Sequence, residues 1–157
     1  MGGGTISKSK EQIIYDNGSW SVGYDNPGEY YRTGWTVIGG TLGTNKITLS
    51  VNSANTVSLI GISSPINITK YSTLHVLCKG VTTTSGSSYY GTIVISSTKE
   101  YSNATNPPYK GLDITSNVEH EVAMDISELS GNGYISIRTQ INTAVNRSCE
   151  VYKIWLT

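Results

Sequence analysis

The sequence contains no phenylalanine and only four alanines among its 157 residues, and charged residues make up 14% of it. Strong helix formers are scarce, which excludes a mainly helical or α/β fold. The eleven basic and eleven acidic residues cancel. No basic patch runs along the chain, so nothing provides the electrostatic attraction that nucleic-acid binding needs. No stretch approaches the roughly 20 apolar residues of a membrane-spanning helix, so membrane insertion is not expected.

Small polar and β-branched residues take the place of the missing types. Ser, Thr, Asn and Gly together account for 69 residues, and the many Ile, Val and Thr residues suit a pleated, half-buried surface. Apolar residues alternate in short runs, as Leu74, Val76 and Cys78 do, which is typical of strands. We therefore expect strands near residues 13–15, 35–38, 46–51, 57–62, 73–79, 90–97, 120–126, 134–141 and 148–156.

Nine short strands separated by turn residues predict an all-β domain, an antiparallel two-sheet β-sandwich. The connections at residues 16–34 and 99–117 are long, and a simple meander of hairpins has no use for such loops. We therefore expect a jelly-roll topology, in which strands cross between the two sheets.

The chain divides into a Gly-rich N-terminal arm, residues 1–12, and one domain, residues 13–157. Three consecutive glycines predict a flexible arm. The arm lacks the apolar core of a secretory signal, so synthesis in the cytoplasm without a signal peptide is expected. Cys78 and Cys149 lie in apolar runs, which favours buried free thiols. A disulfide between neighbouring strands is the alternative that the sequence leaves open.

Catalytic patterns are missing from the sequence. His75 and His120 lie in expected strands without a nucleophile motif, and no metal-ligand spacing or phosphate-binding loop is present. We expect no catalytic residues, no enzyme activity and no cofactor. Oxygen ligands for a structural calcium ion need no linear motif, and Asp16, Asn17, Glu29 and Glu150 are the residues that leave this option open; ordinary turn and surface roles are favoured, so no metal site is predicted.

Tyrosine is the positive signal, with eleven residues that cluster in two regions. A tyrosine ring offers a flat apolar face and a polar tip, which suits stacking on sugars and packing against proteins equally. Trp35 and Trp155 begin or belong to apolar runs and are expected in the core. The candidate contact residues lie mainly in the expected loops and are Tyr24, Tyr30, Tyr31, Arg32, Tyr89, Tyr101 and Tyr109.

Three segments carry a resemblance to a known family: IIYDNGSWSVGYDNPGEYYRTGW, ITKYSTLHVLCKG, and AMDISELSGNGYISIR with the closing CEVYKIWLT. Together they resemble a jelly-roll domain that is similar to carbohydrate-binding modules and occurs in virion proteins of tailed bacteriophages. The likeness covers roughly residues 13–157. It implies a sandwich that binds without catalysing, but no sugar-contact motif can be matched residue by residue.

The resemblance favours a non-catalytic virion accessory protein, a capsid decoration or tail-associated component that is displayed on the particle. Its expected partners are other virion proteins, contacted through the N-terminal arm, and surface glycans of the host; a homo-oligomer is expected. The alternatives are a stand-alone carbohydrate-binding adhesion module or lectin outside a virion, and a glycan-depolymerising domain. Capsid or tail location and the order of the oligomer are left open.

Overall fold

The computed structural model describes residues 11–30, 32–99 and 109–157. In these ranges the chain forms strands and one short 3₁₀ helix, η1, Ile68–Lys70. The strands are β1 Gln12–Asp16, β2 Ser19–Trp20, β3 Tyr24–Asp25, β4 Thr36–Ile38, β5 Thr41–Leu42, β6 Ile47–Val51, β7 Thr56–Ile62, β8 Ile66–Asn67, β9 Thr73–Thr82, β10 Gly91–Ser96, β11 Tyr109–Ile114, β12 His120–Asp125, β13 Asn132–Ile141 and β14 Arg147–Leu156. Among the described residues no helix is long and apolar enough to span a membrane.

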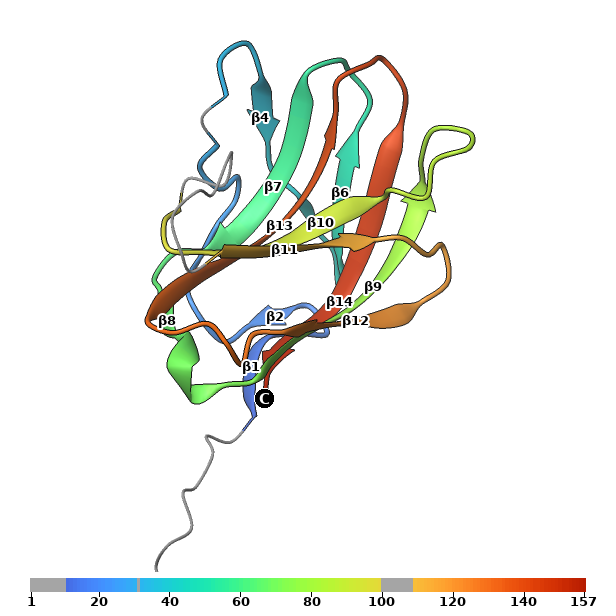
Figure 1. The fold of residues 1–157 in the computed structure, drawn as a ribbon. Helices are drawn as coiled ribbons and strands as arrows, with labels where there is room; N and C mark the ends of the chain where they lie inside the picture. The colour runs from blue at the N-terminus through green and yellow to red at the C-terminus, as the bar shows by residue number, and fades with distance from the viewer. Residues whose placement is uncertain (1–10, 31, 100–108) are drawn as a thin grey trace, which may run out of the picture.

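The strands form two sheets that face each other (Figure 1). The first sheet has the order β12-β9-β14-β1-β2, with β6 also paired to β14 and β5 to β6. The second has the order β11-β10-β13-β7-β3, with β4 paired to β7 and β8 to β13. All these pairs are antiparallel except β4 with β7. The predicted fold class, an antiparallel two-sheet sandwich of the jelly-roll type, is confirmed.

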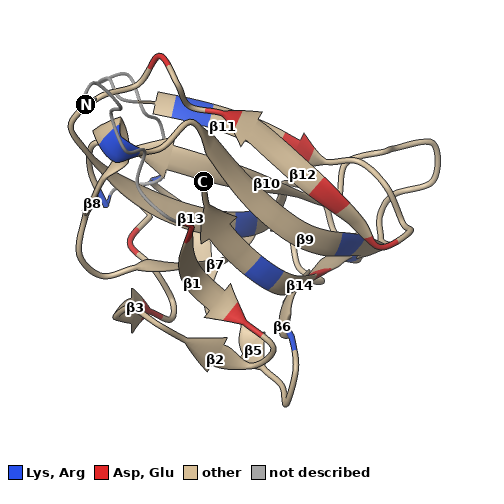
Figure 2. Cartoon of the chain, turned by 90° about the horizontal axis from the view of Figure 1, so that it is seen from below, with Lys and Arg blue, Asp and Glu red and all other residues tan. Residues whose placement is uncertain are grey.

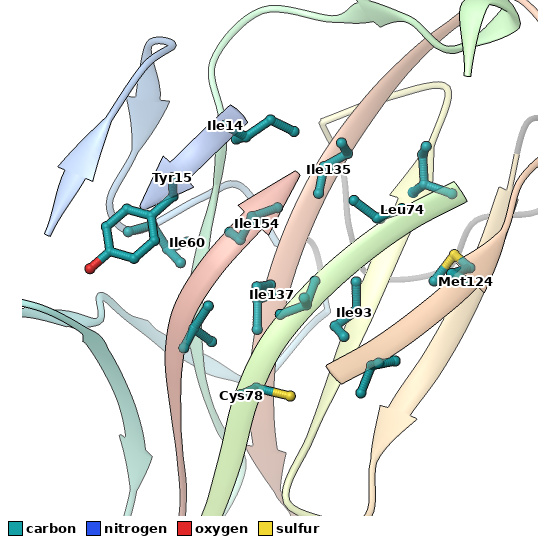
Figure 3. Close-up of a cluster of buried hydrophobic side chains, with 14 of the residues drawn as sticks. Ile14, Tyr15, Ile60, Leu74, Cys78, Ile93, Met124, Ile135, Ile137 and Ile154 are labelled. Carbon is teal, nitrogen blue, oxygen red and sulfur yellow. The ribbon is translucent and has the colours of Figure 1, made fainter. Parts of the chain in front are cut away.

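The core lies between the sheets because each long strand directs alternate apolar side chains inward. Ile14, Leu74 and Ile154 come from the first sheet, and Ile93 and Ile137 from the second; all five are at most 2% exposed. Figure 3 shows these side chains meeting between the layers. Cys78 and Cys149 are buried in the same core as free thiols, as the sequence predicts.

Five strands were not expected from the sequence, namely β2, β3, β5, β8 and β11, and β11 is the longest of them. Residues 109–114 fall inside a predicted long loop, yet they form β11 at the edge of the second sheet. Four of its six residues are exposed, and Ile114 is the buried exception. An edge strand that is exposed to solvent on both faces has no alternation of apolar and polar residues, so hydrophobic periodicity does not identify it as a strand. The expectation of a loop over 99–117 is wrong for this part of the segment.

The two ends of the described chain lie at one end of the sandwich (Figure 1). Gln12 pairs with Leu156 and Asp16 with Lys153, so β1 runs antiparallel beside the C-terminal end of β14. The connection from β13 to β14 lies at the opposite end, at the top of Figure 1. The predicted arm falls outside the described residues up to residue 10, and Gln12 already belongs to β1.

Candidate functional site

Residues at the end of β13 and the start of β14 line a small cleft. Figure 1 shows that these ends of the two strands lie away from the termini. The volume of the cleft is about 160 Å³. Residues from four separate parts of the chain line it, namely Arg32, Trp35, Tyr89, Gln140, Ile141, Asn142 and Arg147. This lining combines rings, amides and guanidinium groups, and it includes no carboxylate side chain.

The segment before β4 carries Arg32 and Trp35 to the cleft. The amide of Asn26 fixes this segment, because its side chain donates to the carbonyl of Gly40 at 3.0 Å and accepts from the Gly40 N–H at 2.8 Å. The Trp35 N–H then donates to the Arg32 carbonyl at 3.1 Å. Gly34 has a φ of +82°, which is the left-handed conformation required at the third position of a type II turn. This turn places the guanidinium over the indole.

Trp35 forms one wall of the cleft, and Tyr30 packs behind it. Tyr30 packs with Val57 and Leu59 in a small buried cluster on the outer side of β7, separate from the main core. Trp35 packs against this cluster, and its ring lies 6.1 Å from that of Tyr30 at 58°. The Tyr30 hydroxyl donates to Gln140 Oε1 at 3.4 Å, so the buried ring also orients an amide that faces the cleft.

Arg147 is held in place on the opposite wall. Its Nη1 donates to the Gln140 carbonyl at 2.6 Å, and its Nε donates to the Thr83 hydroxyl at 3.2 Å. The Thr83 hydroxyl in turn donates to the carbonyl of Tyr89 at 2.6 Å. The guanidinium carbon lies 4.6 Å from the centre of the Tyr89 ring. These contacts fix Arg147 and Tyr89 as one unit before any ligand arrives.

Tyr89 is a neutral hydrogen-bonding group at this wall. Burial raises the pKa of its phenol, an effect that exceeds the opposing pull of a hydrogen bond with Thr92 and of Arg138 and Arg147. The Thr92 hydroxyl lies 3.0 Å from the Tyr89 hydroxyl and 3.1 Å from Asp113 Oδ1. The phenol therefore stays protonated around neutral pH and is anchored to β10.

The sequence-based candidates separate into three groups. Arg32 and Tyr89 come together at the cleft, and Tyr30 lies behind it at 8% exposure. Tyr24 lies apart, with its ring stacked on Trp20 at 4.6 Å. Tyr109 begins β11 at the sheet edge and is 41% exposed. Tyr31 and Tyr101 lie outside the described residues.

Gln140, Asn142 and Arg147 line the cleft although no sequence pattern pointed to them, and Trp35 was expected in the core. Trp35 is half-buried in the small outer cluster rather than in the main core. Arg147 begins β14, 115 residues after Arg32, and reaches the cleft only because β13 ends and β14 begins beside it. A local signal was available for Trp35, since the spacing of Arg32, Gly34 and Trp35 is that of a turn closed by an aromatic residue. No local pattern marks Arg147.

A second polar cluster lies on the outer face of the first sheet. His75 places Nδ1 3.0 Å from Glu121 Oε2 and Nε2 2.8 Å from the Thr157 hydroxyl. This is the order carboxylate, imidazole, hydroxyl that activates nucleophiles in hydrolases. However, the neighbouring amides of Ser72 and Thr73 already donate to the Thr157 carbonyl, so they are not free to stabilise an oxyanion.

The aromatic ring in this second cluster, Trp155, contacts two charged or polar neighbours. The His75 ring stacks on Trp155 at 4.8 Å and 7°, and the Lys153 ammonium lies 4.6 Å from the same ring. Figure 2 shows the surroundings: basic residues on β9 and β14 lie beside acidic residues on β12. The Trp155 ring and the charged groups around it therefore contact other residues of the protein, and these contacts link β14 to β9 and β12.

The residues considered for calcium do not gather at one point. The Glu150 carboxylate binds the Lys46 ammonium and accepts from the Tyr152 hydroxyl at 3.0 Å. Asp16 and Asn17 line a different, shallow hollow. Over residues 11–30, 32–99 and 109–157, no three side chains of His, Cys, Asp or Glu lie close enough together to hold a metal ion.

Comparisons with known proteins add a distant likeness in fold. No family model and no curated protein sequence matches the chain. Among solved structures, a family two carbohydrate esterase from Cellvibrio japonicus aligns with a TM-score of 0.47 and 11% identity over 94% of this chain. The Endo-D glycoside hydrolase domain from Streptococcus pneumoniae R6 aligns with a TM-score of 0.49 and 15% identity over 85% of this chain. The chain spans 33% and 21% of those two proteins. The fold assignment itself rests on the strand order and register described above.

Proposed function

We propose that the protein is a non-catalytic recognition domain that binds a glycan in the cleft between Trp35 and Tyr89. The observation that carries this proposal is the lining of the cleft: two aromatic side chains, two amides and two guanidinium groups converge on a space of about 160 Å³. Rings stack on the C–H faces of sugars, and Asn, Gln and Arg side chains hydrogen-bond to hydroxyl groups. Sites for drug-sized ligands begin at roughly 300 Å³, so this cleft suits a single sugar residue.

The support for a binding role without catalysis is chemical. The cleft lining carries no carboxylate pair, which glycoside hydrolysis needs, and the imidazole outside it has its neighbours committed to protein contacts. A glycan-depolymerising domain is the competing proposal. Asp16 and Glu29 are carboxylates that would serve such hydrolysis. The competing proposal predicts cleavage of a capsular polysaccharide that is lost on changing either residue, whereas the recognition proposal predicts no cleavage by the wild-type protein.

A glycan array probed with the full chain tests the binding role. We expect at least one glycan to be retained by the wild-type protein and lost with Trp35→Ala. Because Trp35 packs against the small cluster, circular dichroism at the assay temperature checks that this variant is still folded. Tyr109→Ala is the matched control, because it removes an exposed ring on β11, outside the cleft. Retention of no glycan at millimolar protein concentration contradicts the proposal.

We further propose, from the sequence resemblance, that the domain is displayed on a bacteriophage particle and works as a homo-oligomer. The placement of the termini at one end and the cleft at the other suits such display, because attachment through the arm leaves the cleft facing outward. Mass spectrometry of purified particles tests the location. Absence of the chain from the particles contradicts it and leaves the stand-alone lectin as the alternative.

A further inference from the structure

We propose that the cleft is selective for acidic glycans, and that Arg32 and Arg147 bind a carboxylate group of the sugar. This inference rests on the proposed glycan-binding function and names its ligand class.

All three arginines of the sequence gather at or behind this cleft, although eight lysines are spread over the rest of the chain. Each guanidinium lies over a different ring: Arg32 is 4.3 Å from the Trp35 centroid, Arg147 is 4.6 Å from Tyr89, and Arg138 is 5.7 Å from Tyr30. Arginine stacks on rings and binds planar anions with its edge. Charged residues are only 14% of the sequence, yet all of its arginines lie at or behind this cleft.

None of these positive charges is neutralised within the described residues. The four ion pairs there join lysines or His75 to carboxylates, and no arginine takes part. The Asp113 carboxylate acts on Tyr89 and is linked to it through the Thr92 hydroxyl, and it forms no ion pair with an arginine. Uncompensated charges in a concave site attract and concentrate a ligand of opposite charge.

Arg138 adds a third positive charge behind the lining of the cleft. It lies two residues before Gln140 on β13 and therefore on the same face of the strand. Its Nε and Nη1 are buried without a hydrogen-bond partner among the described residues. Buried donors without partners are costly and are few in native proteins, and a bound anion or water would satisfy them. A positive charge kept under the cleft strengthens the attraction for an anion above it.

The free donor groups fit a carboxylate. Arg147 uses Nε and Nη1 on protein oxygens, which fixes its orientation and leaves Nη2 free among the described residues. The Arg32 side chain makes no described hydrogen bond and is exposed, so its whole planar edge is available. Two guanidinium edges that face one small space match the two oxygens of a carboxylate. The amides of Gln140 and Asn142 remain for hydroxyl groups of the same sugar.

The test is a panel of uronic-acid and sialic-acid oligosaccharides, each paired with the methyl ester of its own carboxyl group. The methyl ester keeps every hydroxyl and removes only the charge. We expect the full chain to bind at least one acidic member, and to lose affinity by about tenfold to a hundredfold on esterification, the range expected for a pair of charge-assisted hydrogen bonds. Binding should also weaken as salt is raised.

Variants assign the effect to the cleft. Arg32→Gln should lower affinity for the acidic glycan at least tenfold, and it breaks no described hydrogen bond that folding could need. Arg147→Gln should do the same, with its melting temperature measured because this arginine also holds Thr83 and Gln140. Lys153→Gln is the matched control: it removes one positive charge stacked on a ring, Trp155, outside the cleft, and should leave affinity unchanged.

Three results overturn the inference. Equal binding of an acidic glycan and its methyl ester, with loss on Trp35→Ala, leaves glycan recognition standing and removes the acidic selectivity. Equal weakening by Lys153→Gln means that the overall charge, and not the cleft, attracts the ligand. Retention of no glycan in either form removes the proposed function together with the inference.

Discussion

At the scale of single residues, Gly80 lies unusually close to the ring of Tyr90. A Cβ atom on Gly80 would lie 2.2 Å from the Tyr90 ring, so the ring takes the space beside β9 that a side chain would occupy. Tyr90 packs against the main core while Gly80 is buried. The glycine and the tyrosine act as one packing unit.

We therefore expect Gly80→Ala to lower the free energy of unfolding by about 1–3 kcal/mol, the usual cost of overpacking a core. Denaturant unfolding followed by fluorescence measures it. Gly111→Ala is the control, because its new Cβ would meet the nearest heavy atom at 3.4 Å, an ordinary contact. Equal stability of Gly80→Ala and the wild-type protein contradicts the close packing.

The two cysteines make a second prediction at this scale. Burial raises the pKa of the Cys78 thiol to about 12, and burial also raises the pKa of the Cys149 thiol, with smaller contributions from Cys78 and Glu150. The thiolate is the reactive form, so both groups stay protonated and inert at pH 8. A disulfide reagent should label neither cysteine in the native protein and both in guanidinium chloride. Rapid labelling of the native protein is the contrary result.

At the scale of elements, the sequence predicts the strands that bury one face and misses those that do not. The spacing of Leu74, Val76 and Cys78 locates β9 because the inner face is apolar and the outer one polar. β11 is exposed along most of its length, and β2, β3, β5 and β8 have two residues each. Such strands are defined by hydrogen bonds to a neighbour rather than by their own composition.

The candidate site is predictable to the extent that it is local. Tyr30, Arg32 and Trp35 are close in sequence. The cluster of aromatic residues in this segment is visible in the sequence and identifies one wall of the cleft. Gln140 and Arg147 form the other wall through the register of β13 and β14 with their neighbours. Register depends on how whole faces pack, so no short sequence pattern specifies which residues meet there.

Glu150 joins β14 to β6 and should make stability depend on pH. Burial alone would raise the pKa of this carboxyl, but hydrogen bonds from Lys46 and Tyr152, together with the positive charges of Lys46 and Lys79, lower it overall. A lowered pKa in the folded state stabilises the protein above the unfolded value of about 4.3, and this contribution is lost as pH falls through the folded value.

We therefore expect Glu150→Gln to lower the free energy of unfolding by about 1–2 kcal/mol at pH 7, the scale of hydrogen bonds to a charged group. The difference from the wild-type protein should shrink below about pH 4. Urea unfolding at a series of pH values measures it. Glu29→Gln, at an exposed position, is the control and should change little at any pH. A constant difference down to pH 2 contradicts the assigned role.

At the scale of the whole molecule, one core joins both sheets and should make unfolding cooperative. The main cluster includes residues from β1 to β14, whereas the cluster of Tyr30, Val57 and Leu59 is separate from it. Both clusters contain residues of β7, Ile60 on its inner face and Leu59 on its outer face. We therefore expect the small cluster to unfold together with the main core, because both depend on β7.

The three tryptophans report on this cooperativity from different places. Trp20 packs on the main core, Trp35 on the small cluster, and Trp155 on the outer face of the first sheet. Variants with a single tryptophan, each made by replacing the other two with tyrosine, should share one unfolding midpoint with the far-ultraviolet circular dichroism of the same variant. An earlier midpoint for Trp35 alone would mean that the cleft wall melts before the sandwich.

The antiparallel pairing of β1 with β14 also determines how the molecule resists mechanical force. A pull between the two termini acts at one end of this pair and opens its hydrogen bonds one after another, because those bonds run perpendicular to the strands. A pull between the N-terminal end and a ligand in the cleft acts along the length of the same strands and loads the bonds together. The fold is therefore expected to yield easily when stretched by its ends and to hold firmly when anchored by β1 and pulled by what it binds.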